Sequence, residues 1–193
     1  GQRTCMVWDA EEGSVISVLR QGAASEVFPF GDRLLTWGTS FDMGLPTIWD
    51  LASSKRVCQF KGHPVLVNAA AIFPAGDQVI TCSFDRTASI WSAATCLLLH
   101  ELLHPVPEYH HVTAVVVLEQ GEVVGTTTMC GRMFLWSTIS GKLLRELRSS
   151  SFSENDPVFK LQAFPSDKRL LTVNTGSAIL WDATHGLLLS EFF

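Results

Sequence analysis

The chain has 193 residues, of which 47% are hydrophobic and 17% charged, and its net charge at neutral pH is −5. This balance argues against the basic footprint of a nucleic-acid-binding protein, because 14 Lys and Arg residues are outnumbered by 19 Asp and Glu residues. The longest apolar stretch, residues 112–118, is far shorter than the roughly 20 residues that a membrane span needs. We therefore expect a globular chain whose partners are other proteins, with no nucleic acid and no membrane among them.

Five of the six tryptophans recur at nearly constant intervals of 41, 42, 45 and 45 residues. Each is followed by Asp or Ser, then by a short polar turn, and then by an apolar strand. A spacing this regular indicates a repeat architecture. The recurring residues are Trp8, Trp49, Trp91, Trp136 and Trp181, and only Trp37 falls outside the pattern.

In chain order, residues 3–9 and 15–19 are predicted to form a pair of strands, and four larger units follow. Gly- and Asp-containing turns separate the first and second strands of each unit. Within the second unit, residues 67–73 alternate as one apolar face of a strand, while the opposite face is apolar too. Both faces must therefore be covered by neighbouring sheets. The predicted boundaries are 1–19 for the pair, and 20–60, 61–102, 103–147 and 148–193 for the larger units.

The most complete unit runs from Gly62-His63 to Trp91-Ser92. Its order is Gly-His, strand, Pro-x-Gly turn, strand, Asp-x-Thr turn, strand and Trp. This order resembles the WD-repeat family of β-propellers, and the resemblance covers essentially the whole chain. Other units lose some marks of the family, since only one Gly-His pair is present and the turn aspartate is replaced by Cys130 and Thr175 in the last two units.

The resemblance implies an all-β propeller segment with four full four-stranded blades and the outer half of a preceding blade. Residues 1–193 would form a single segment of this kind. The C-terminal unit does not supply the inner strands that would complete the half blade. We therefore expect a partial propeller whose remaining blades belong to the same, longer protein, and a ring closed by four blades alone is the alternative.

The resemblance also implies a buried hydrogen-bonded network that locks one blade. By position in the family pattern, its members are His63, Thr81 or Ser83, Asp85 and Trp91. Such a network satisfies polar groups that burial would otherwise leave unpaired. We favour this structural role over a hydrolytic triad of His63, Ser83 and Asp85.

A candidate partner-binding surface follows from the turns between the second and third strands. Two neighbouring units carry Ser-Phe-Asp there, and the next unit has a methionine. In the family this turn opens onto the top face of the ring, and the residue before the aspartate often touches ligands. Large apolar side chains on adjacent turns would form a patch of the kind that anchors partners. The alternative is that the phenylalanines pack between blades. The predicted partner-binding residues are Phe41, Phe84, Arg86 and Met129.

One segment matches a zinc-protease motif, namely His100-Glu101-Leu102-Leu103-His104 with His110 as a third ligand. The segment sits where an outer strand is expected, and a strand would separate the two imidazoles by about 13 Å. Pro105 also opposes a continuing helix. No phosphate-binding glycine loop or nucleophile elbow occurs in the sequence. We predict no catalytic residue, no metal and no cofactor, so the chain is not expected to be an enzyme.

The five cysteines are odd in number and include no Cys-x-x-Cys pair. We predict reduced thiols in the core of an intracellular protein, cytoplasmic or nuclear, with a disulfide or a zinc site as the alternative. The expected function is that of a non-catalytic scaffold or adaptor within a larger protein. The alternative is a recognition module of a multidomain enzyme or complex, such as a ubiquitin ligase or a signalling ATPase. The cysteines are Cys5, Cys58, Cys82, Cys96 and Cys130.

Overall fold

The computed structural model describes residues 5–19, 24–38, 45–107, 110–149, 157–158, 160–164 and 168–193. These residues form one two-stranded and four four-stranded antiparallel sheets, each built from strands consecutive in the chain. The half sheet contains β1 (Cys5–Trp8) and β2 (Val15–Leu19); sheet 1 contains β3 (Ala24–Val27), β4 (Arg33–Trp37), β5 (Thr47–Asp50) and β6 (Lys55–Gln59). Sheet 2 contains β7 (Val67–Ile72), β8 (Gln78–Ser83), β9 (Thr87–Ser92) and β10 (Leu98–Leu103); sheet 3 contains β11 (Val112–Leu118), β12 (Val123–Thr128), β13 (Met133–Ser137) and β14 (Leu143–Leu147). Sheet 4 contains β15 (Lys160–Ala163), β16 (Arg169–Val173), β17 (Ala178–Asp182) and β18 (Leu187–Phe192).

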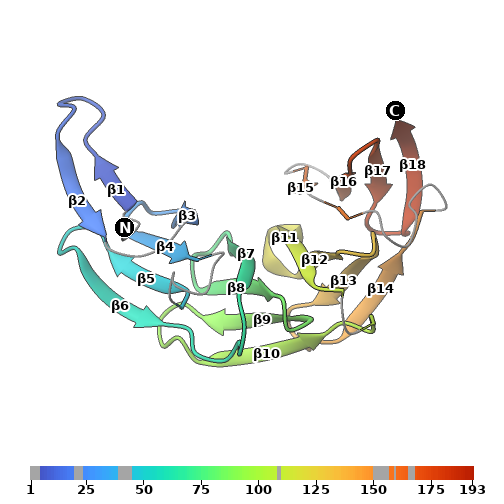
Figure 1. The fold of residues 1–193 in the computed structure, drawn as a ribbon, viewed down its shortest axis with the longest axis horizontal. Coiled ribbons are helices and arrows are strands. Elements are labelled where there is room, and N and C mark those ends of the chain that lie inside the picture. Colours follow the sequence, from blue (N-terminus) through green and yellow to red (C-terminus); the bar gives the residue numbers. More distant parts are fainter. Residues whose placement is uncertain are drawn as a thin grey trace.

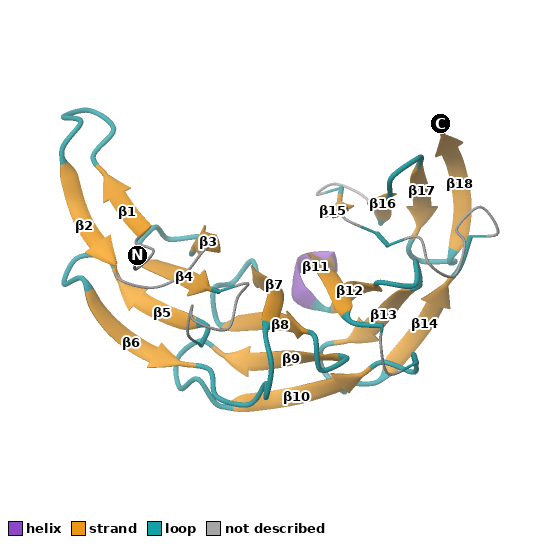
Figure 2. Ribbon diagram, in the orientation of Figure 1, coloured by secondary structure: helices purple, strands orange, loops and turns teal. Residues whose placement is uncertain are grey.

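The sheets stack side by side in an open arc, with the half sheet at one end and sheet 4 at the other (Figure 1). The predicted all-β architecture of four four-stranded blades after an outer half blade is confirmed. The four blades do not close on themselves, because the two ends of the arc stand apart (Figure 1). A single turn of 3-10 helix, Glu119–Gly121, interrupts the otherwise all-strand pattern of the described residues (Figure 2).

The hydrophobic core consists of separate layers, each lying between two neighbouring four-stranded sheets. Phe28, Ile48 and Trp91 pack between sheets 1 and 2. Ile80, Ile90 and Phe134 belong to the layer between sheets 2 and 3, and Met133, Leu170 and Trp181 to the layer between sheets 3 and 4. Apolar residues are therefore needed on both faces of each inner sheet, as the sequence predicts.

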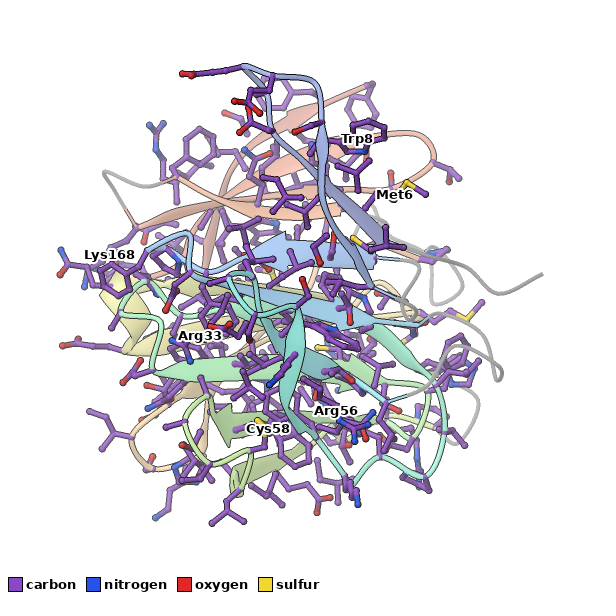
Figure 3. The ribbon with its side chains drawn as sticks, turned by 90° about the vertical axis from the view of Figure 1, so that its left-hand side faces the viewer. Met6, Trp8, Arg33, Arg56, Cys58 and Lys168 are labelled. Atoms are coloured by element: carbon purple, nitrogen blue, oxygen red, sulfur yellow. A yellow bond between two sulfur atoms is a disulfide. The ribbon has the colours of Figure 1, made fainter. Side chains whose placement is uncertain are left out.

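The solvent exposure of each repeated tryptophan depends on whether a neighbouring sheet covers its side chain. Trp91 is 1% exposed, and Trp136 and Trp181 are also buried. Trp8, on the half sheet at the end of the arc, is 56% exposed (Figure 3). Met6 on the same strand is exposed too. The N-terminal end of the arc thus presents an uncovered apolar face.

A β-bulge marks each sheet where its last strand passes the repeated tryptophan. The register shifts by one residue at this point in all five sheets of the described chain, so each last strand carries one extra residue. These extra residues are all apolar and all exposed: Ile16, Val57, Leu99, Leu144 and Leu189.

Neighbouring four-stranded sheets also touch at their outer edges through one repeated contact. The turn before each last strand contains a residue with positive φ, which is usually glycine here. A Cβ atom on Gly141 would lie 2.8 Å from Nδ1 of His100 on β10, and one on Gly186 would lie closer still to the Arg145 side chain on β14. Glycine is therefore required at these two turns by both conformation and space.

The corresponding contact between sheets 1 and 2 is a disulfide. Cys58 on β6 is bonded to Cys96, which holds the positive-φ position with a φ of 55°, and their Cα atoms are 6.1 Å apart. The sulfur at Cys58 is visible in Figure 3. The prediction of reduced thiols is wrong for this pair, because sheet packing brings together two cysteines that the sequence keeps far apart. Cys5, Cys82 and Cys130 are free thiols.

Candidate partner-binding site

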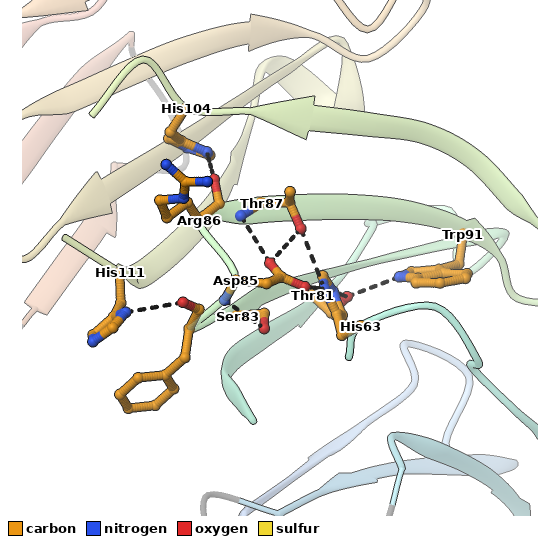
Figure 4. Close-up of polar contacts among 10 residues, drawn as sticks. His63, Thr81, Ser83, Asp85, Arg86, Thr87, Trp91, His104 and His111 are labelled. Atoms are coloured by element: carbon orange, nitrogen blue, oxygen red, sulfur yellow. Dashed lines mark hydrogen bonds and ion pairs between the residues drawn. The ribbon is translucent and has the colours of Figure 1, made fainter. Parts of the chain in front are cut away.

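Phe84, His111 and Met129 form a small cluster where sheets 2 and 3 meet. The ring centroids of Phe84 and His111 are 4.3 Å apart. Nδ1 of His111 donates a hydrogen bond to the carbonyl oxygen of Phe84 (Figure 4), and the amide of Met129 donates to the carbonyl oxygen of His111. We call these three residues the top cluster. The edge of the sheets that carries residues 84–86, 104–107, 110–111 and 129–132 is called the top edge.

The top cluster is only partly covered by the rest of the protein. Met129 is 44% exposed, and Phe84 is half-buried against the imidazole of the next sheet. The structure therefore combines features of both sequence alternatives, since Phe84 packs against the neighbouring sheet yet stays accessible. Phe41, the other predicted phenylalanine, lies outside the described residues. His111 was missed by the sequence analysis, because nothing in its own unit distinguishes it.

Arg86 occupies the same turn as Phe84, but its backbone carbonyl contacts a different histidine, His104. Its φ is 71°, and its carbonyl oxygen accepts a hydrogen bond from Nδ1 of His104 at 3.0 Å. Arg86 thus links the turn of sheet 2 to the connection that enters sheet 3 (Figure 4). Whether its side chain also contacts a partner stays a prediction.

Below this edge, His63 joins Asp85 and Thr81 in a buried polar chain (Figure 4). Nδ1 of His63 lies 2.7 Å from the Asp85 carboxylate, so this nitrogen carries the proton. Its Nε2 then accepts from the Thr81 hydroxyl at 2.7 Å, and Nε1 of Trp91 donates to the same oxygen at 2.8 Å. Thr81, and not Ser83, holds the central place. Ser83 instead accepts a hydrogen bond from the amide of Asp85.

Two opposing effects set the pKa of Asp85. Burial raises the pKa of this carboxyl, but hydrogen bonds from His63 and Thr87 outweigh burial and hold the pKa below its usual value. Asp85 is therefore ionised at neutral pH. Gly62 is required beside this chain, because a Cβ atom there would lie 2.6 Å from the Trp91 ring. The arrangement explains why glycine precedes this histidine.

Sheet 3 contains a second chain of this kind, which the sequence analysis missed. Nε2 of His104 lies 2.7 Å from the Thr126 hydroxyl, and Nε1 of Trp136 donates to Thr126 at 2.9 Å. Burial lowers the pKa of His104 to about 4, so its imidazole is neutral at neutral pH. His104 belongs to the motif that resembles a zinc protease, but here its neighbour His100 lies on strand β10. Among the described residues, no group of three or more His, Cys, Asp or Glu side chains could hold a metal ion.

One element of these chains recurs in all four four-stranded sheets. A threonine on the second strand accepts a hydrogen bond of 2.8–2.9 Å from the indole of the repeated tryptophan. The threonines share the period of the tryptophans, which is the sequence signal that could have revealed them. The pairs are Thr36 with Trp49, Thr81 with Trp91, Thr126 with Trp136 and Thr172 with Trp181.

Residues 54–92, which include the first of these chains, match the family model of the WD domain, G-beta repeat. This part of the chain therefore matches a WD repeat, and its sheets are arranged like propeller blades. Its fold is similar to the crystal structure of the computationally designed Ika8 protein, with a TM-score of 0.79 and 20% sequence identity. That similarity covers 98% of this chain and 55% of the designed one.

Two curated relatives are also similar to this chain. Pre-mRNA-splicing factor cwf17 of Schizosaccharomyces pombe is 26% identical over 117 residues, which cover 60% of this chain and 33% of the relative. Apoptotic protease-activating factor 1 of Rattus norvegicus is 24% identical over 192 residues, covering 96% of this chain and 15% of the relative. The chain therefore spans a third or less of the length of either relative. No helix within the described residues is long and apolar enough to cross a membrane.

Proposed function

We propose that this chain is a non-catalytic protein-interaction segment, and that partners bind at the top edge between sheets 2 and 3. The observation that carries the proposal is the top cluster. It contains a half-buried aromatic ring and an exposed methionine, and both residues are joined to His111 by hydrogen bonds. Partly buried aromatic side chains and methionines of this kind are enriched in the anchoring residues of protein interfaces. WD repeats generally serve as such interaction platforms.

The relatives support a role inside a larger assembly. The match to apoptotic protease-activating factor 1 takes up 15% of that protein, so there the similar segment is one part of a long chain. We infer the same arrangement here: residues 1–193 act as one interaction segment of a longer protein that holds the remaining blades. A scaffold or adaptor role follows, and a recognition module of a multidomain enzyme or complex is the second candidate.

An intracellular location, cytoplasmic or nuclear, forms part of the proposal. The similarity to a pre-mRNA-splicing factor supports a nuclear location. The Cys58–Cys96 disulfide argues against an intracellular location, because disulfides are rare in reducing compartments. Alkylation of free thiols in intact cells, followed by mass spectrometry, tells whether the two cysteines are bonded where the protein resides.

The test of the interaction role compares variants at the two edges of sheets 2 and 3. Cells expressing Phe84→Ala or Met129→Ala should lose proximity labelling of partners, while melting of the purified variants changes little. Leu97→Ala is the matched control, since Leu97 is an exposed apolar residue in the turn between β9 and β10, at the opposite edge. Equal losses of labelling for all three variants, or losses that follow melting, would contradict a partner site at the top cluster.

A further inference from the structure

The Cys58–Cys96 disulfide occupies a contact that the fold builds at the outer edge of every pair of neighbouring four-stranded sheets. One side of the contact is the residue that follows the β-bulge on the last strand of a sheet. The other side is the positive-φ residue in the last turn of the next sheet. Sheet packing, and not the bond, therefore brings the two sides together. The three pairs are Cys58 with Cys96, His100 with Gly141, and Arg145 with Gly186.

The turn that carries Cys96 does not need the bridge to hold its conformation. Ser54 has the same place in the turn of sheet 1 and cannot form a disulfide, yet its φ is 56° against 55° for Cys96. The amide of Cys96 also donates a hydrogen bond of 2.8 Å to the carbonyl oxygen of Ser92, which closes the turn. Cys96 therefore faces Cys58 in the reduced chain as well, and the bond can form again without refolding.

The bridge lies at the margin of the protein and not in its core. Cys58 and Cys96 are both half-buried, and they pack on the border of the apolar layer between sheets 1 and 2. Leu97, next to Cys96 in the chain, is 66% exposed. The free thiols of Cys82 and Cys130 are buried instead. Because the rate of thiol–disulfide exchange depends on access, the bridge is more open to small thiols than either core cysteine.

Arg33 holds the same turn on sheet 1 by a second, non-covalent contact. It donates hydrogen bonds to the carbonyl oxygens of Gly76 at 3.1 Å and of Ala93 at 3.4 Å, and Ala93 belongs to the turn that contains Cys96. The turn should therefore remain docked when the bond breaks. Since two thiol sulfur atoms cannot approach as closely as two bonded ones, opening the bond loosens the outer edges of sheets 1 and 2 while the apolar layer stays packed.

We propose that Cys58 and Cys96 form a site of reversible thiol–disulfide exchange with a small thiol such as glutathione. In reduction, a glutathione thiolate attacks one sulfur of the bridge, forms a mixed disulfide with it and releases the other cysteine, which takes up a proton. A second glutathione thiolate attacks the glutathione sulfur of the mixed disulfide and releases glutathione disulfide and the remaining cysteine. The bridge gains two electrons and two protons, and the two glutathione molecules lose the same number. Oxidation of the two thiols by glutathione disulfide is the reverse reaction.

A reversible bond reconciles the disulfide with the proposed intracellular location. Disulfides in reducing compartments are rare, and those that occur are mostly transient or redox-sensing. The covalent tie between sheets 1 and 2 would then follow the thiol–disulfide balance of the compartment. This inference goes beyond the interaction role, because the exchange involves no residue of the top cluster.

The test incubates the folded 193-residue chain in glutathione buffers that range from fully oxidised to fully reduced. Alkylation in denaturing urea and intact mass give the fraction of open bridges, and tryptophan fluorescence reports the fold. The bridge should open and close again with the fold retained, at an opening rate proportional to the glutathione concentration. At a fixed glutathione concentration, half closure should need several hundredfold less glutathione disulfide in the folded chain than in denaturing urea, because folding already places the two sulfur atoms together.

A displaced pair provides the matched control. The double variant Cys58→Ser and Val57→Cys moves one thiol by a single residue, onto the β-bulge, and leaves Cys96 in place. Closure of this pair should need at least about tenfold more glutathione disulfide than closure of the wild-type pair, because the displaced thiol does not face the turn.

Four outcomes would overturn the proposal. A bridge that stays closed in fully reduced glutathione is a permanent structural bond. An opening rate that is independent of glutathione and rises steeply with urea below the unfolding transition would show that the bond breaks only after unfolding. Loss of native fluorescence on opening would show that the fold requires the bond, and equal closure of the displaced pair would show that the contact does not direct it. None of these results bears on the top cluster, which is tested separately by partner labelling of Phe84→Ala.

Discussion

Loss of the Cys58–Cys96 disulfide should destabilise the chain by about 4 kcal/mol. The bridge joins residues with a sequence separation of 38. In the chain-entropy model, closing a loop of that length lowers the entropy of the unfolded chain by about 13 cal/mol/K, which is about 4 kcal/mol at 25 °C. A whole domain is stable by only 5–15 kcal/mol, so the change should be large and easily measured.

Two single substitutions should separate the bridge from the backbone strain beside it. Cys58→Ser removes the bridge and leaves Cys96 at a φ of 55°, a conformation that disfavours residues other than glycine. Cys96→Gly removes the bridge as well, but restores the residue that sheets 3 and 4 use at this turn. Cys96→Gly should therefore be the less destabilised of the two variants, by about 1 kcal/mol.

The assay is urea unfolding of the wild-type chain and both variants, with and without dithiothreitol. The wild type should lose about 4 kcal/mol in the reductant, while the two variants should not respond to it. Intact mass after alkylation of the oxidised protein in denaturing urea should show three modified cysteines, because Cys5, Cys82 and Cys130 are free and unfolding exposes the two that are buried. Five modified cysteines before reduction, or a wild type that is indifferent to the reductant, would refute the reasoning.

Three further predictions concern the buried chains and the ends of the arc. His104 is neutral in the fold with a pKa of about 4 and has an ordinary pKa of 6.5 when unfolded, so stability should be full above pH 6.5 and fall by about 3 kcal/mol by pH 4. Urea unfolding against pH measures this loss, and His104→Gln should flatten it. Thr81→Val leaves Nε2 of His63 and Nε1 of Trp91 without their hydrogen-bond partner, whereas Thr172→Val removes the indole partner of Trp181 and no histidine contact. The first should therefore cost about 1–3 kcal/mol more in the same assay. The uncovered face of the half sheet should make the isolated chain self-associate or bind a hydrophobic dye, and a monodisperse monomer without dye binding would contradict this.

The regular features of the fold could be predicted from the sequence because they repeat. Tryptophan spacing gave the number of sheets, and apolar residues on both faces of the strands indicated that sheets cover one another. The buried chain of His63, Thr81, Asp85 and Trp91 lies within one repeat unit, so the family pattern could locate its members.

Contacts between sheets could not be predicted in the same way. The Cys58–Cys96 bond, the ring contact of Phe84 with His111 and the pairing of Arg132 with Pro105 each depend on how one sheet sits against a neighbouring segment. His104 was hidden for a different reason, because Leu103 precedes it where the family has glycine. Periodicity describes residues within one repeat, whereas these contacts arise from the angle and offset between repeats.

The β-bulges opposite the tryptophans limit how copies of this chain can associate. The last strand of each sheet is hydrogen-bonded on one side only, and such an edge is a template on which a foreign strand can add. One extra residue in each last strand breaks the run of evenly spaced backbone donors and acceptors. A foreign strand could then pair over only a few residues on either side of the bulge. Growth of continuous sheets towards amyloid from these last strands is therefore disfavoured.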